Sequence, residues 1–356
     1  MKNIIKSVIV MLSSISLFAS ANAGELSVSG SAKATYNIQS GKTNAGKGLG
    51  ITNELNFTAS GELDNGYTWS YSMELDPGEN STSPQSNANN DDTKLTLGTP
   101  YGTVGVFISE GGLDVEDAAS QSVYGRPTDI GDPSGTTDNL TIDSYNNVQY
   151  HTPADLIPFG TTFKIAYAPN TSDTSAGSSG NNAGAVNTIS TSNNGANATE
   201  MQIKATPYDG LTVGASYFEF DGSGLAKSTQ EAESGAYYAT YATGPISVGY
   251  SKAYKALLRA DGDFTTTTNV SYYDQTNYSI AFAATDDITV SYEQETSEAV
   301  KVQSGTTNVE QKSTGVQIAY TMGGMTLALA HNSHDNNGYV TGANQDQTLL
   351  AVTMAF

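Results

Sequence analysis

The chain has 356 residues, with 36 Asp and Glu against 15 Lys and Arg, a formal net charge of −21 and no Cys. This balance excludes nucleic acid as a partner, because binding a polyanion requires a basic face. Without Cys there is no disulfide framework, so stability must come from packing or from backbone pairing. The acidic charge is compatible with a merely solvated surface, and equally with a surface or pore that attracts cations.

The first 23 residues predict a secretory signal peptide. Lys2 and Lys6 give a positive start, residues 8–19 are apolar, and Ala21-Asn22-Ala23 offers small residues for cleavage. The apolar run is too short to span a bilayer. We therefore expect a leader over residues 1–23 and a single mature domain over residues 24–356.

From residue 25 onward the dominant pattern is strict alternation of apolar and polar residues. In the first such stretch, 25–38, Leu26 and Val28 share one face, while Ser27 and Lys33 lie on the other. A long strand with one apolar and one polar face suits a barrel wall with lipid outside and water inside. In chain order, the same pattern predicts further strands around 51–63, 67–75, 95–97, 104–108, 148–150, 163–167, 201–205, 211–217, 236–242, 246–250, 278–282, 288–292, 316–320, 325–329 and 350–356. The facing of 236–242 stays open, because both of its faces contain Tyr.

The connections between these strands alternate in length. Short turns fall near residues 65, 100, 158, 209, 244, 286 and 324. Long polar segments lie between them, at about 39–50, 77–92, 110–143, 169–198, 221–234, 255–268, 298–310 and 334–345. Short periplasmic turns and long extracellular loops are typical of outer-membrane barrels. The sequence therefore predicts an all-β transmembrane antiparallel β-barrel of about sixteen strands, surrounded by outer-membrane lipids and lipopolysaccharide.

Four segments resemble the Gram-negative general porins, particularly the alphaproteobacterial branch: residues 24–30, 97–105, 146–153 and the terminal Phe356. The resemblance extends over essentially the whole mature chain. It implies a sixteen-stranded barrel, a homotrimer and a third loop folded into the pore. It also implies that Phe356 belongs to the signal read by the barrel-assembly machinery.

The third loop of the family corresponds here to residues 110–143. Its candidate constriction residues are mostly acidic: Glu110, Asp114, Glu116, Asp117, Asp129 and Asp132, followed by Asp138 and Asp143, with Arg126 as the single basic residue. Inside a pore, such a loop would concentrate cations and repel anions. The alternative is an ordinary solvated acidic loop outside the pore.

The family usually places basic side chains on the wall opposite this loop. The alternation points four lysines inward as candidates: Lys33, Lys94, Lys164 and Lys204. They differ from the family pattern because they are Lys rather than Arg, and because inward acids dilute them, namely Glu54, Glu74, Glu293 and Glu295. Each lysine could also be simply a hydrated residue of the lumen.

The chemistry of an enzyme is not apparent in this sequence. The three His, at 151, 331 and 334, form no recognisable triad, and neither a phosphate-binding glycine loop nor a His/Cys metal spacing occurs. We therefore expect a porin without catalytic activity, cofactor or metal. It would be a water-filled channel for passive diffusion of small hydrophilic solutes and ions, with a preference for cations. The alternatives are a substrate-selective channel, a β-rich surface adhesin or structural protein, and an outer-membrane hydrolase.

Overall fold

The computed structural model describes residues 24–41, 45–76, 89–130, 138–169, 197–221, 228–257, 259–260, 269–302 and 307–356. The expected leader, 1–23, and the candidate residue Asp132 lie outside these described residues. Within the described part of the chain, no helix has both the length and the apolar character needed to cross a membrane.

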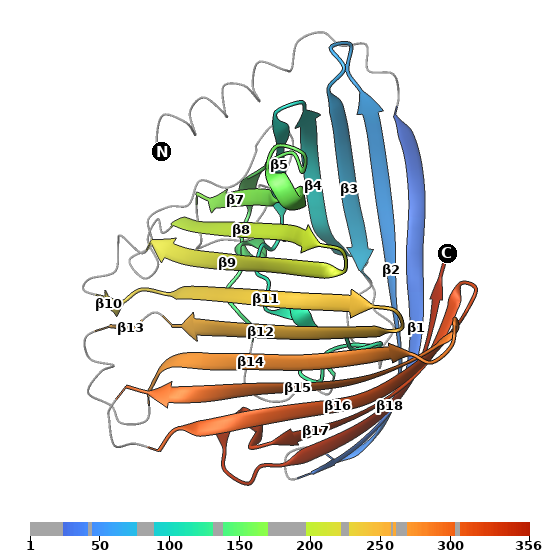
Figure 1. Ribbon diagram of the computed structural model, residues 1–356, viewed down its shortest axis with the longest axis vertical. Helices are drawn as coiled ribbons and strands as arrows, with labels where there is room; N and C mark the ends of the chain where they lie inside the picture. The colour runs from blue at the N-terminus through green and yellow to red at the C-terminus, as the bar shows by residue number, and fades with distance from the viewer. Residues whose placement is uncertain are drawn as a thin grey trace.

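Sixteen antiparallel strands form one closed barrel (Figure 1). Neighbours along the chain pair around the wall, and the first strand pairs with the last. The wall strands are β1 (Glu25–Gly41), β2 (Gly46–Glu62), β3 (Thr68–Asp76), β4 (Asn89–Thr99), β5 (Gly102–Ile108), β6 (Asn147–His151), β7 (Thr162–Ala168), β8 (Asn197–Tyr208), β9 (Leu211–Asp221), β11 (Glu233–Thr243), β12 (Ile246–Ala256), β14 (Val270–Ala283), β15 (Ile288–Lys301), β16 (Val309–Met322), β17 (Met325–Asp335) and β18 (Gln345–Ala355). The fold and strand number predicted from the alternation are confirmed.

The strand register places polar residues opposite polar ones on the inner face, and apolar residues opposite apolar ones on the outer face. Lys33 is opposite Thr52 on β2 and Thr353 on β18, and all three belong to the polar, inward set. Leu329 is opposite Ile318 and Leu350, and these side chains are 42–46% exposed on the outer face. Because the outer face meets lipid in the outer membrane, the exposed apolar belt is the lipid-facing surface.

Several strands extend further than their apolar cores suggested. β1 continues to Gly41 and β2 begins at Gly46, so the first connection is much shorter than the predicted 39–50. The predicted loops 221–234 and 255–268 each contain a short strand, β10 (Ser228–Gln230) and β13 (Arg259–Ala260), which pair with each other outside the barrel sheet. In these strands the backbone pairing continues beyond the apolar belt, because the hydrogen bonds between strands do not depend on apolar side chains.

The register also settles the facing of 236–242. Tyr238 points inward and is 6% exposed, whereas Tyr237 points outward and is 53% exposed. Tyr238 is opposite Gly214 and Ser251, which are on the inner face. A glycine at 214 leaves space for this ring, since a Cβ there would crowd the ring carbon Cε1 of Tyr238.

The first and last strands of the barrel meet at the seam between β1 and β18. The Gly30 N–H donates to the Phe356 carbonyl at 2.9 Å, and the Phe356 N–H donates to the Gly30 carbonyl at 3.0 Å. The Phe356 ring is 69% exposed. The final residue thus completes the ladder that closes the barrel.

We predict that a charge on the outer face destabilises the barrel, whereas the same charge on the inner face does not. Leu329→Arg should lower the free energy of unfolding by about 2–4 kcal/mol, the cost of an arginine near the middle of the bilayer. Ser72→Arg is the control, because Ser72 is opposite Thr58 and Lys94 on the inner face. Urea unfolding in liposomes, followed by the fluorescence of Trp69, measures both variants, and equal destabilisation would contradict the facing described here.

Candidate functional site: a loop folded into the barrel

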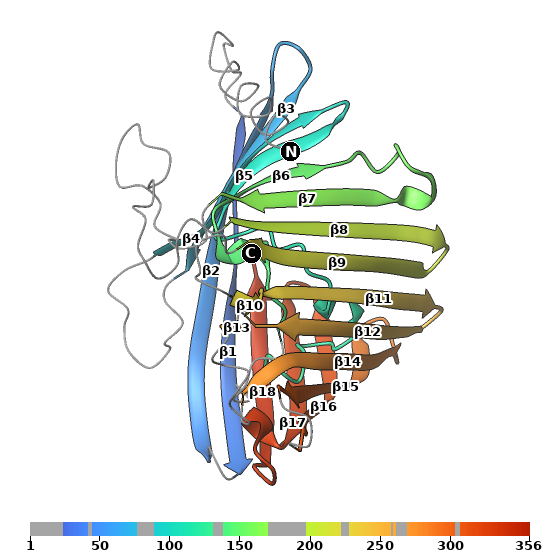
Figure 2. The ribbon, with the colours of Figure 1, turned by 90° about the vertical axis from the view of Figure 1, so that its left-hand side faces the viewer.

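The described parts of the long connection between β5 and β6, residues 109–130 and 138–146 (the inner loop), run inside the barrel. Its hydrogen bonds reach across the inner faces of β8, β11, β12, β14, β15 and β16. Figure 2 shows the teal and green segment behind the strands of this wall. The inner loop therefore occupies part of the lumen, as the resemblance implied.

Glu200 of β8 anchors both ends of the inner loop. Its carboxylate accepts the N–H of Leu113 at 3.2 Å and the N–H of Ile142 at 2.9 Å. Gln202, next on the same face, donates to the Leu113 carbonyl at 2.9 Å. Glu200 is fully buried beneath these contacts. One inward carboxylate thus ties together two loop segments that are about thirty residues apart.

The middle of the inner loop touches the wall through backbone carbonyls. The Ser251 hydroxyl donates to the Glu116 carbonyl at 2.8 Å, and the Ser279 hydroxyl donates to the Ala119 carbonyl at 2.6 Å. Gly249 lies between these points, and a Cβ there would overlap the Ala119 carbonyl. Close approach of the loop to β12 and β14 therefore requires glycine at 249.

Two adjacent inward glutamates of β15 hold the next part of the inner loop. Glu295 accepts the Arg126 Nε–H at 2.8 Å and the Thr128 N–H at 3.0 Å. Glu293 accepts the hydroxyls of Ser120 and Ser122. These carboxylates satisfy loop groups that the barrel ladder cannot reach.

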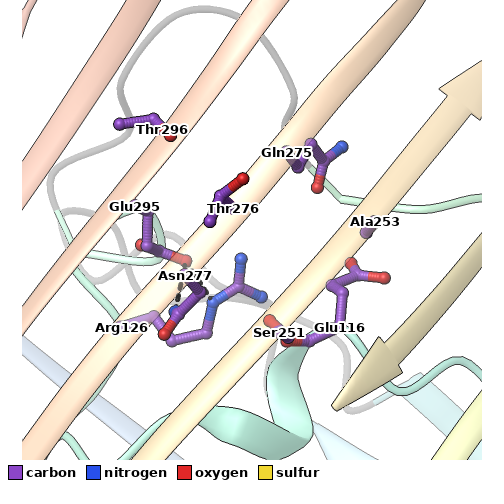
Figure 3. A pocket seen from close by; sticks show the side chains of 9 residues that line it. All are labelled: Glu116, Arg126, Ser251, Ala253, Gln275, Thr276, Asn277, Glu295 and Thr296. Carbon is purple, nitrogen blue, oxygen red and sulfur yellow. Dashed lines mark hydrogen bonds and ion pairs between the residues drawn. The ribbon is translucent and has the colours of Figure 1, made fainter.

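Arg126 is the electrostatic centre of this junction. It is 6% exposed and forms ion pairs with Glu295, with Asp117 and, at 3.7 Å, with Asp138. A small cavity of about 20 Å³ lies beside it, lined from the loop by Glu116 and Arg126 and from the wall by strands β12, β14 and β15 (Figure 3). The only basic residue of the loop sequence is thus buried and paired with acids.

Mostly small apolar residues on the inner face of the wall pack against the part of the loop around Ile130. Ile130 is buried against Ala319, Ala328 and Ala330, with Leu349 and Ala351 in the same cluster. In an open lumen these inward positions would be polar. Apolar residues on the inner face of β17 and β18 therefore mark a wall that the loop covers.

The predicted acidic residues divide into exposed and buried groups. Asp117, Asp129 and Asp138 are exposed, and Glu110, Asp114 and Asp143 are partly exposed. Glu116 differs from this expectation, because it is only 4% exposed and its Oε1 accepts the Asn139 N–H at 2.8 Å. Burial raises the pKa of the partly exposed Asp143 above the usual value. The lumen-facing charge of the loop is thus carried by aspartates rather than by Glu116.

All four predicted lysines occupy inward positions, but in three different places. Lys94 forms an ion pair with Glu110 at the start of the loop. Lys33 lies with its ammonium 5.6 Å from the ring centre of Tyr124. Lys164 and Lys204 lie near each other on β7 and β8. Their role as a basic counter-wall remains a prediction.

The sequence reasoning placed Glu293 and Glu295 inward but read them as lumen charges, and it overlooked Glu200 and Gly249. The available signal was two successive inward glutamates, flanked on the same face of the strand by Ser291 and Ser297. Among the described residues, no group of three or more His, Asp or Glu is arranged to hold a metal ion.

The barrel fold is similar to that of solved porins and outer-membrane proteins. The chain is similar to Salmonella typhi OmpF in complex with daunomycin, with 12% identity over 94% of this chain and 98% of that chain and a TM-score of 0.63. A refined porin structure gives 16% identity over 93% of this chain and 100% of that chain, with a TM-score of 0.61. OmpT of Vibrio cholerae, solved with one loop deleted, gives 12% identity over 94% of this chain and 100% of that chain, with a TM-score of 0.59. At such identities the likeness establishes the fold of a porin-type barrel.

Sequence comparison supplies the family. The sequence model of the Gram-negative porins matches residues 8–304. The chain belongs to the Gram-negative porin family, and it is an outer-membrane protein that forms a diffusion channel. No curated protein sequence matches the chain.

We predict that Glu295 positions the inner loop. In Glu295→Gln, the buried Arg126 keeps Asp117 and Asp138 but loses the carboxylate that accepts its Nε–H, and breaking a buried ion pair typically costs up to about 3–5 kcal/mol. The loop should detach locally, so single-channel recordings should show frequent partial closures. Glu54→Gln is the matched control, since among the described residues Glu54 accepts a hydrogen bond from Asn56 of its own strand and makes none with the inner loop. Indistinguishable single-channel recordings from the two variants would contradict this role.

A second prediction concerns pH. Burial, followed by repulsion from Asp114, raises the pKa of Glu116 to about 8. A raised carboxyl pKa means that the stabilising contribution is complete at acid pH and is lost as pH rises toward 8. Above pH 8 the ionised Glu116 also meets Asp138, although Arg126 partly offsets this charge.

Raising the pH from 6 to 9 should therefore increase the open-channel noise of the wild-type protein. Glu116→Gln mimics the protonated carboxyl and should keep the noise low at both pH values. If the variant retains the same pH response as the wild type, another group is responsible.

Proposed function

We propose that this porin is a cation-preferring channel whose selectivity is set by the aspartates of the inner loop. The observation that supports this is the uneven burial of loop charge. The basic Arg126 is 6% exposed and ion-paired, whereas Asp117, Asp129 and Asp138 remain exposed. Water screens exposed charges but leaves a field that attracts counter-ions into a narrow passage.

The basic side chains near the loop do little to cancel this field. Lys94 is paired with Glu110, so that ion pair contributes little net charge. Asp114 and Asp143 are partly exposed near the ends of the loop and add to the acidic side. The balance of charge on the described part of the inner loop is therefore negative.

The wall formed by β1–β3 supports passage of varied hydrophilic solutes. Its inward positions are mainly hydroxylated, including Ser29, Ser31, Thr58, Ser70 and Ser72. The aromatic residues of these strands are at outward positions. A substrate-selective channel would need an aromatic track, so we favour passive diffusion over selective uptake and over any catalytic activity.

We further propose that residues 1–23 are a cleaved leader and that the mature chain forms a homotrimer among outer-membrane lipids and lipopolysaccharide. We also propose that Phe356 is read by the barrel-assembly machinery. Its place at the seam, paired with Gly30, supports this role because a reader of the last strand would find the residue unburied.

The test is the reversal potential of the refolded protein across a KCl gradient in a planar bilayer. The wild type should favour K⁺, with conductance steps in threes if it is a trimer. Replacing Asp114, Asp117, Asp129, Asp138 and Asp143 with Asn should reduce the preference severalfold. Asp286→Asn/Asp287→Asn, which removes two exposed acids of a periplasmic turn, is the control. Anion preference in the wild type would refute the proposal.

A further inference from the structure

Three basic side chains gather on the inner wall of β6–β8, here called the β6–β8 basic cluster: His151, Lys164 and Lys204. His151 is directly opposite Lys164. Lys164 is opposite Gln202, and Lys204 is two residues further along the same strand, on the diagonal. Directly opposite residues have Cβ atoms about 5 Å apart and diagonal ones about 7–8 Å. Both ammonium groups can therefore reach a single small ligand in the lumen.

These lysines have no acidic partner. Among the described residues, no carboxylate lies within 4.0 Å of either ammonium, although Lys94 and Lys252 have such partners. Their charged neighbours are positive instead: the charge of Lys204 repels that of Lys164, and the charge of Lys164 disfavours a proton on His151. The nearest wall acid, Glu200, is fully buried and accepts hydrogen bonds from the inner loop. Like charges placed together without compensation are destabilising, and a bound anion would relieve that repulsion.

The β6–β8 basic cluster lies on the periplasmic side of the inner loop. Gln202 holds the Leu113 carbonyl, and Lys204 follows two residues nearer the turn at 209–210. Lys164 is two residues from the start of β7, just after the turn that follows β6. A solute that has passed the inner loop meets the cluster before it leaves the barrel.

The imidazole is held in one orientation beside the lysines. The side-chain amide of Gln149 donates to the Gly111 carbonyl at 2.5 Å and to Asn147 Oδ1 at 2.9 Å. Its Oε1 is therefore an acceptor, so the Nε2–H of His151 donates to it at 2.7 Å. The imidazole of His151 therefore stays in a fixed position beside Lys164.

We propose that Lys164 and Lys204 form a binding site for small oxyanions of the phosphate class on the periplasmic side of the pore. A lysine ammonium is a compact point charge that binds phosphate oxygens without a fixed geometry. A doubly charged oxyanion can place a separate oxygen on each ammonium group, whereas a chloride ion offers one centre and a single charge. The site is separate from the aspartates of the inner loop, and the inference does not depend on the cation preference.

The test is ³¹P NMR of inorganic phosphate with the refolded porin, at about 0.1 M salt so that charges 10 Å apart are only partly screened. Wild-type protein should broaden the phosphate line in a saturable manner. Lys164→Gln/Lys204→Gln should weaken the apparent affinity at least about tenfold, since it removes both ammonium contacts. Lys33→Gln, which also removes an inward positive charge, should leave the affinity within about twofold.

Planar-bilayer recording gives the functional counterpart. Phosphate in place of chloride at equal K⁺ concentration should raise the K⁺ preference of the wild type, and of Lys33→Gln, but not of the double variant, because a bound dianion cancels the two ammonium charges. Equal phosphate responses in wild type and double variant, or loss of the response in Lys33→Gln as well, would overturn the proposal. The KCl reversal potential of the same proteins reports separately on the inner-loop aspartates, so failure of one proposal is distinguishable from failure of the other.

Discussion

The constraint on which the rest of this structure depends is that backbone N–H and C=O groups in a bilayer must pair with each other, because lipid offers them no partner. A closed ladder of sixteen strands meets this requirement, and the reciprocal hydrogen bonds between Gly30 and Phe356 complete it at the seam. Once the wall is closed, the period of two assigns every second side chain to lipid. Only the remaining inward positions are available for function.

The inner loop meets the same requirement in a different way. Its backbone lies inside the barrel, outside the strand ladder, so its N–H groups need acceptors from elsewhere. The wall glutamates provide them: Glu200 to Leu113 and Ile142, and Glu295 to Thr128. Small residues then allow close approach, as Gly249 does below Ala119. The shape of the lumen is therefore determined by a few inward residues that do not themselves face the passing solute.

The division between local and long-range information explains how much the sequence could predict. The alternation is local, so it predicted the strands, their number and the inward facing of Lys33, Lys94, Lys164 and Lys204. Burial of Glu116 and Arg126 could not be predicted in this way, because Arg126 meets Glu295 across 169 residues of sequence. The same holds for Glu293 and Glu295, whose inward facing was clear but whose partners were not. Inward alanines at 328 and 330 were a readable sign of a covered wall.

Charge on the inner surface follows burial. Where the inner loop excludes water, buried charges have partners, since an isolated charge there would carry a large desolvation cost. Arg126 pairs with Glu295, and Glu200 accepts backbone hydrogen bonds. Where water reaches the wall, charges of one sign remain together: aspartates on the loop, and Lys164 with Lys204 on the periplasmic side. The mutual repulsion of the like charges within each group opposes folding. A moving solute would therefore meet two fields of opposite sign in succession, one from the loop and one from the wall.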